Sequence, residues 1–109
     1  MTGPAAGRGF PNRVVIGGVL VSSQALRYTP AGVPIVTASL RHESEQSEAG
    51  QARRVDCPLE LVVIGDEAQR FAAIAPGSGL KLAGFLAARH RNSPVLVLHV
   101  TEFRTIQTD

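Results

Sequence analysis

Few side chains in this chain of 109 residues have the type and spacing that catalysis requires. The single cysteine, Cys57, lies on the inward face of an alternating strand pattern, which is typical of a small buried hydrophobe rather than a nucleophile. The histidines at positions 42, 90 and 99 do not have metal-ligand spacing, and one cysteine cannot build a structural zinc site. His99 is typical of a half-exposed histidine within a strand. We therefore expect no metal site and no cofactor.

Two other motifs resemble catalytic ones. The segment "PGSGLKLAG", residues 76–84, looks like a phosphate-binding loop, but its glycines follow a helical pattern and open a strand, which reverses the order of such loops. The adjacent carboxylates Asp66 and Glu67 suit the start of a helix, and they lack partners for general acid–base catalysis. We expect a protein without catalytic residues that is not an enzyme.

Basic and aromatic side chains remain as candidates for function, and their chemistry is binding. The net charge is only +2, but bases and acids are segregated along the chain. Residues 12–41 hold three arginines and no acid, residues 42–52 hold three glutamates and no Lys or Arg, and residues 81–91 hold three bases and no acid. The sequence leaves open whether these are solvated loop ends or a basic face for a polyanion.

Aromatic side chains supply the surfaces on which the bases of single-stranded nucleic acid stack. The chain has four Phe, one Tyr and no Trp. Phe71 falls in a helical segment and is expected in the core, which leaves Tyr28 and Phe85 as the best stacking candidates. With a period of two, Phe85 shares a strand face with Lys81 and Arg89, although a core or dimer contact would explain Phe85 equally well.

The first half of the chain is predicted to hold a tail and three strands. Residues 1–11, rich in Gly, Ala and Pro, predict a disordered tail before one domain over residues 12–107. Strands are predicted in "RVVIGGVLVSS", with a bulge or bend at Gly17-Gly18, and in "VPIVTASLRH", with the turn "TPAG" between them. Residues 43–52 are predicted to form a long exposed hairpin loop before the strand "RRVDCPLELVVIG".

The second half is predicted to hold a helix and two strands. Asp66 and Gln69 form a capping-box pattern at the start of a helix of about two turns, "EAQRFAAIA". The strands "LKLAGFLAAR" and "VLVLHVTEFRTI" follow, with a turn between them. The order β-β-β-α-β-β predicts an all-β fold with one short helix, a five-stranded Greek-key barrel of the OB-fold type. No apolar run is long enough to span a membrane, and a single cysteine is compatible with a reducing cytoplasm.

The segment "NRVVIGGVLVSSQALRYTPAGVPIVTASLRHES" resembles the opening of bacterial single-stranded DNA-binding proteins. The segment "TPAGVPIVTASLRHESEQSEAGQARRVDCPLELVVIG" resembles one branch of these more closely, the primosomal replication protein N (PriB) family. The resemblance covers the chain from Asn12 to about Ile106. The positions that carry it are Pro30, Gly32, Pro34, Leu40, His42, Glu48, Ala49, Gly50, Arg53 and Cys57.

The resemblance implies a bacterial cytoplasmic protein of replication restart, a dimeric OB-fold that binds single-stranded DNA and assists the restart helicase and a helicase-loading partner. It implies that the first strand, Val14, Val15 and Ile16, contributes to the dimer interface. Together with the residue chemistry, it predicts a DNA-binding set: Arg27, Tyr28, Arg41, Arg53, Arg54, Lys81, Phe85, Arg89, His90 and Arg91.

Two departures from the family leave alternatives open. Gln51 and Asp56 stand where relatives have aromatics, so we expect weaker DNA binding with a steeper salt dependence. The alternatives are a protein-interaction OB module with little affinity for DNA, and a generic single-strand binding protein. The short end "RTIQTD" argues against the generic protein, because it lacks a long acidic tail.

Overall fold

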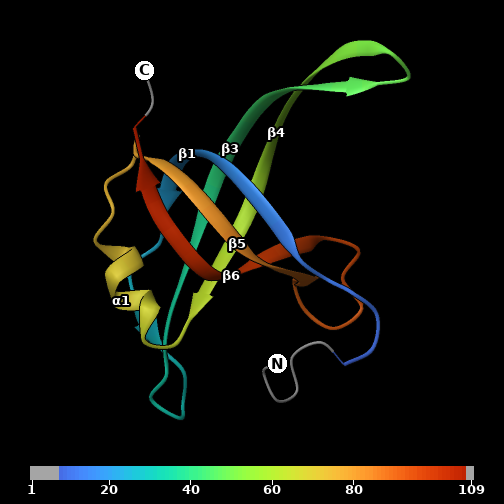
Figure 1. Cartoon of the computed structure of the whole chain (residues 1–109). Helices are drawn as coiled ribbons and strands as arrows, with labels where there is room; N and C mark the ends of the chain where they lie inside the picture. Colours follow the sequence, from blue (N-terminus) through green and yellow to red (C-terminus); the bar gives the residue numbers. More distant parts are fainter. Residues whose placement is uncertain (1–7, 108–109) are drawn as a thin grey trace.

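A computed structural model describes residues 8–107 of the chain. It contains a closed barrel with one helix (Figure 1). The elements are β1 (Val14–Ser23), β2 (Arg27–Tyr28), β3 (Pro34–Glu48), β4 (Gln51–Ile64), α1 (Glu67–Ala72), β5 (Gly79–Ala88) and β6 (Leu96–Ile106). Most of the predicted tail, residues 1–7, lies outside the described residues, so the domain boundary stays a prediction.

Five strands close the barrel, as predicted for an OB-fold. The sheet order is β1-β5-β6-β4-β3-β2, and pairing of β1 with β3 closes it. Within residues 8–107 only one strand pair is parallel: β4 meets β6 through Leu61↔Leu98 and Val62↔His99. The two-residue strand β2 was not predicted, because a strand this short has no periodic pattern to detect; it extends the edge of β3 opposite Pro34 and Ile35.

The core is built from the inward-facing positions of these strands, and α1 covers one end of it. Leu20, Leu40, Leu61, Leu80, Leu82 and Leu98 are buried inside the barrel. Phe71 of α1 is fully buried, as predicted, and its ring meets Phe103 edge-on with centroids 5.0 Å apart. Edge-to-face contact is the arrangement that aromatic quadrupoles prefer.

The predicted bend at Gly17-Gly18 is present. β1 pairs with β5 from Val14 to Val19 and turns to pair with β3 from Val19 onward, with a register shift between Leu20 and Ser22. A Cβ atom at Gly18 would collide with the backbone carbonyl of Arg41, so glycine is what allows β3 to approach β1 so closely.

The predicted hairpin loop at residues 43–52 is wrong. β3 continues to Glu48 and β4 begins at Gln51, so the segment is part of a two-stranded ribbon, residues 43–56, that projects beyond the barrel (Figure 1). Its turn is Ala49-Gly50, with φ of 54° and 76°, a backbone that matches the twist of a hairpin. Both faces of this ribbon are in solvent, so its strands lack the alternation of apolar and polar residues on which strand prediction depends.

The predicted capping box at the helix is also wrong. Asp66 precedes the helix but makes no capping hydrogen bond, because its backbone is already helical (φ −57°, ψ −31°), whereas a capping residue acts from an extended backbone. Gln69 instead donates from Nε2 to the hydroxyl oxygen of Tyr28 at 3.2 Å. The helix ends at Ala72, three residues short of the predicted end.

Two side chains tie segments to the barrel. The amide of Asn12 donates to the carbonyl oxygen of Leu86 at 2.8 Å and accepts from its N–H at 2.9 Å, which continues the pairing of β1 with β5. His42 Nδ1 donates to the carbonyl oxygen of Gly17 at 2.7 Å, and its Nε2 lies 2.8 Å from the hydroxyl of Ser44. The imidazole therefore holds the base of the β3–β4 ribbon against β1.

Candidate nucleic-acid interface

A row of outward-facing side chains crosses four strands of the barrel. Register places Thr37 of β3 opposite Val62 of β4, Val62 opposite His99 of β6, and His99 opposite Phe85 of β5. Val36, Val63, Leu98 and Val100, their neighbours along the strands, are buried. Since strand residues alternate between faces, the row lies on the outer surface. These four positions form the central row of the candidate interface.

Phe85 and His99 stack at one end of the central row. Their ring centroids are 5.0 Å apart and the ring planes differ by 8°. Phe85 stays 40% exposed, so the stack presents aromatic surface to solvent. Parallel rings that remain open on one side are the kind of surface on which a nucleic-acid base stacks. His99 was not predicted as a site residue, since its stacking partner is apparent only once β5 and β6 are in register.

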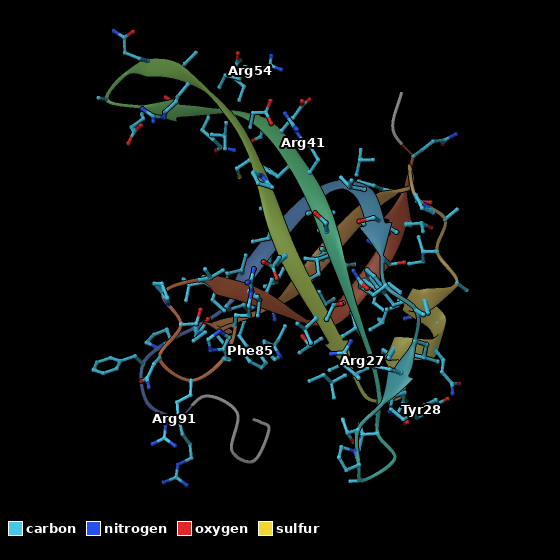
Figure 2. All side chains as sticks on the ribbon, turned by 180° about the vertical axis from the view of Figure 1, so that it is seen from behind. Arg27, Tyr28, Arg41, Arg54, Phe85 and Arg91 are labelled. Carbon is cyan, nitrogen blue, oxygen red and sulfur yellow. The ribbon has the colours of Figure 1, made fainter. Side chains whose placement is uncertain are left out.

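The loop after β5 carries three of the predicted cations in different environments. Arg89 forms an ion pair with Glu60 of β4. His90 Nδ1 lies 3.1 Å from the carbonyl oxygen of Arg91. Among the described residues, no carboxylate forms an ion pair with Arg91, which points away from the barrel below Phe85 in Figure 2. Arg91 is therefore the cation of this loop that is available to a phosphate.

Arg41 at the base of the ribbon and Arg53 and Arg54 on it are each paired with an acid of the facing strand. Three ion pairs cross between β3 and β4: Arg41–Asp56 at 2.8 Å, Arg53–Glu48 at 3.4 Å and Arg54–Glu43 at 3.9 Å. The hydrogen bond from Arg41 lowers the pKa of Asp56, and the same hydrogen bond raises the pKa of Arg41. Residues 43–56 hold four acids and two arginines, so the ribbon is not a basic surface.

The outer surface of β3 and β4 is called the β3–β4 face here. Arg27 and Tyr28 of β2 lie at the side of this face away from Phe85. Tyr28 is 56% exposed, although Gln69 fixes its hydroxyl. Figure 2 shows Arg27 and Tyr28 on one side of this face, Phe85 and Arg91 on the other, and Arg41 and Arg54 toward the ribbon. The predicted DNA-binding residues therefore form separate groups around the central row rather than one cluster.

Lys81 belongs to none of these groups. Lys81 and Phe85 are both exposed on the outer face of β5, as a period of two predicts. Lys81, however, lies directly opposite Arg104 of β6 and lines a cleft of about 550 Å³ together with residues of β1 and α1. This cleft, not the central row, is where the structure places Lys81.

The predicted dimer residues on β1 differ in exposure. Val14 and Ile16 pack against the core, whereas Val15 is 55% exposed. Val19 and Val21 continue the exposed apolar stripe beyond the bend. The alternation of β1 is the sequence signal that could have extended the predicted interface to these two residues, and the interface itself stays a prediction.

Cys57 lies directly opposite His42, yet this pair is not set up for nucleophilic chemistry. Both ring nitrogens of His42 are engaged, one by Gly17 and the other by Ser44. A base that activates a thiol must direct a ring nitrogen at it.

Within residues 8–107 there is also no group of three or more His, Cys, Asp or Glu side chains that could hold a metal ion. No helix of that part of the chain is long and apolar enough to cross a membrane.

Comparisons with known proteins match this architecture. A family model described as "Another single-strand binding protein family" matches residues 12–102. The replication restart protein PriB of Nitrosomonas europaea is 40% identical over 95 residues, which cover 87% of this chain and 88% of that protein. PriB of Neisseria gonorrhoeae is 31% identical over 96 residues, which cover 88% of this chain and 95% of that protein.

Solved structures show the same relationship. PriB from Ralstonia solanacearum matches with a TM-score of 0.83 and 37% identity, covering 90% of this chain and all of that one. The single-stranded DNA-binding protein from Thermus aquaticus matches with a TM-score of 0.72 and 21% identity, over 89% of this chain and 50% of that one, and it shares the fold. On this sequence identity and coverage, the chain belongs to the replication restart protein PriB family, which is related to the single-strand binding proteins.

Proposed function

We propose that this protein binds single-stranded DNA on the central row of its barrel and acts as an accessory protein in replication restart. The observation that carries the proposal is the exposed Phe85–His99 stack at the end of a row that crosses β3, β4, β6 and β5. Its relatives are named as replication restart and single-strand binding proteins, which supports the same role.

In the proposed complex a base stacks on Phe85, a contact that contributes roughly 1–3 kcal/mol. Arg91 and His90 on one side of the face and Arg27 on the other contact phosphates. Arg41, Arg53, Arg54 and Arg89 contribute less, because each would first have to leave a carboxylate. With few stacking groups, phosphate contacts carry most of the affinity, so binding is weak to moderate and falls steeply with salt.

The assembly proposed around this face is a homodimer in the bacterial cytoplasm. The exposed stripe of Val15, Val19 and Val21 is the apolar surface on β1 that a second copy would cover. The dimer assists the restart helicase and the protein that loads the replicative helicase, as the PriB family resemblance implies. A monomer in sedimentation at micromolar concentration would contradict the dimer.

The second candidate is an OB module that binds proteins and has little affinity for DNA. The paired arginines of the ribbon favour it, because residues 43–56 carry more acids than bases. Under this alternative, the restart helicase is retained by the protein in a pull-down whether or not single-stranded DNA is present. Under the first proposal, retention increases when single-stranded DNA is added.

A salt-dependent titration with a labelled oligothymidylate separates the two candidates. We expect binding at low salt that weakens toward physiological salt, and a further loss in Phe85→Ala. Thr105→Ala is the control, because Thr105 is an exposed residue of β6 that lies six positions along the strand from His99 of the central row. Undetectable binding at low salt would leave the protein-binding module as the function. Equal affinities of the two variants would move the DNA site away from Phe85.

A further inference from the structure

A cleft of about 550 Å³ is lined by residues of β1, β5, β6 and α1. These three strands lie nearer the viewer than β3 and β4 in Figure 1. Strands β3 and β4 lie in front in Figure 2, which views the molecule from behind, so this cleft and the β3–β4 face are on different sides. Four basic side chains line the cleft: Arg13, Arg70, Lys81 and Arg104.

Lys81 and Arg104 are directly opposite each other across the β5–β6 pairing. Like charges at directly opposite positions of a sheet are destabilising. Within residues 8–107, no carboxylate forms an ion pair with either side chain. Six described arginines have a carboxylate partner, namely Arg13, Arg41, Arg53, Arg54, Arg70 and Arg89, whereas Arg8, Arg27, Arg91 and Arg104 have none. The Lys81–Arg104 pair is therefore a site of uncompensated positive charge.

The other charges of the cleft are already balanced. Arg70 is held by Glu67 at 2.7 Å, and its guanidinium carbon lies 4.1 Å from the ring centroid of Phe103, a cation–π contact. Arg13 pairs with Glu102 at 3.6 Å. These pairs cancel in charge, so the uncompensated charge of the cleft is that of Lys81 and Arg104.

The lining of the cleft also bears on which anionic ligand it accepts. Val15 is half-exposed but belongs to the stripe of β1 proposed as the dimer interface, and Ala83 beside it is buried, so neither supplies free apolar surface. Phe103 is only 9% exposed beneath Arg70, so no aromatic ring of the lining is open for a base to stack on.

We propose that this cleft binds an acidic peptide segment of a partner protein, with carboxylates on Lys81 and Arg104. The ligand neutralises two like charges that no described residue neutralises. Lys81 and Arg104 lie on β5 and β6 rather than on β1, the strand of the proposed dimer interface. The inference does not rest on DNA binding at the central row.

The test measures fluorescence anisotropy of a labelled peptide of five aspartates, added to the full chain at low salt. We expect saturable binding that weakens at least about tenfold in Arg104→Glu, because like-charge juxtaposition is strongly unfavourable. The same peptide with asparagine in place of aspartate should not bind. Arg91→Glu, which reverses a charge of the loop after β5, is the matched control and should leave peptide binding unchanged.

Arg104→Gln is a second variant, because unfolding of Arg104→Glu would also abolish peptide binding. Removing one of two opposed like charges should preserve or raise the midpoint of thermal unfolding while still weakening peptide binding.

No peptide binding by the native chain, equal binding of the asparagine peptide, or equal losses in Arg104→Glu and Arg91→Glu would each overturn the proposal. If Arg104→Glu instead reduced oligothymidylate binding and not peptide binding, the cleft would be a nucleic-acid surface. Oligothymidylate affinity of the native chain is measured separately, so failure here is distinguishable from failure of the proposed function.

Discussion

Arg41 of β3 and Asp56 of β4 are joined by an ion pair of 2.8 Å at the base of the ribbon. The family resemblance predicts an aromatic residue where Asp56 stands, so this position would lack a stacking group, and its carboxylate neutralises a neighbouring cation. The same pattern recurs along the ribbon, where Glu43 and Glu48 hold Arg54 and Arg53. The ribbon is therefore less suited to bind a polyanion than its three arginines would indicate.

Replacing Asp56 with asparagine should strengthen binding of single-stranded DNA. The substitution keeps the size of the side chain and removes the negative charge that engages Arg41. We expect a rise of about two- to fivefold in affinity at low salt, the range of a surface ion pair, measured by titration with oligothymidylate. Glu102→Gln is the control, since it frees Arg13, which lines the cleft over β1, β5 and β6 and is not part of the central row. No gain in the Asp56 variant would place Arg41 outside the DNA path.

The titration of Asp56 should report the ion pair directly. Arg41 lowers the pKa of this carboxyl below its ordinary value of 3.8, mainly by donating a hydrogen bond to the ionised form. A lowered folded-state pKa stabilises the fold above the ordinary value, and the contribution is lost as pH falls through the lowered one. Carboxyl carbon NMR should show a midpoint below 3.8 that returns toward it in Arg41→Gln. An unchanged midpoint in that variant would rule out Arg41 as the cause.

Charge reversal at two arginines of one loop should have unequal effects. Arg91→Glu should weaken DNA binding and lower the slope of log affinity against log salt by about 0.7 for a lost phosphate contact on a single strand. Arg89→Glu should reduce affinity less, because Arg89 is already engaged by Glu60. Titrations of both variants over a range of salt concentrations test this order. A larger effect at Arg89 would mean that its ion pair opens when DNA binds.

Gly18→Ala should destabilise the barrel where β1 changes partner. A Cβ atom there would collide with the backbone carbonyl of Arg41, so β1 and β3 would have to separate. We expect a loss of about 1–3 kcal/mol in the free energy of unfolding, the usual cost of overpacking, measured in urea. A Cβ atom at Gly17 would lie 3.1 Å from the carbonyl oxygen of Leu80, so Gly17→Ala should lower the free energy of unfolding by less. The reverse order would show that the close approach is not what requires glycine.

The barrel could be predicted from the sequence because burial leaves a periodic pattern. Leu59 and Leu61 alternate with Pro58 and Glu60, and the structure turns Leu61 into the core. The part of the ribbon at residues 43–52 could not be predicted in the same way, since neither of its faces is buried. The capping box failed because tertiary contact with Tyr28 took Gln69 away from the helix start.

The residue types of the candidate site could be predicted from the sequence, but the contacts between these residues could not. Phe85 was identified as an exposed aromatic, whereas His99 became part of the site only through cross-strand register. The same limit applies to the charges: acids and bases that are far apart in sequence, such as Glu60 and Arg89, meet across the sheet. Pairing between strands is a non-local property, and a single sequence carries little information about it.

The parallel seam between β4 and β6 has only two paired positions on each strand, and one of them is His99 of the central row. Short seams are where a closed barrel opens first by local fluctuation, so the amides around Leu61, Val62, Leu98 and His99 should exchange with solvent sooner than those of the long β3–β4 pairing. A strand of DNA that contacts both sides of the seam would be linked to its closure and would protect those amides. Bound DNA would then stabilise the shortest strand pairing of the closed barrel.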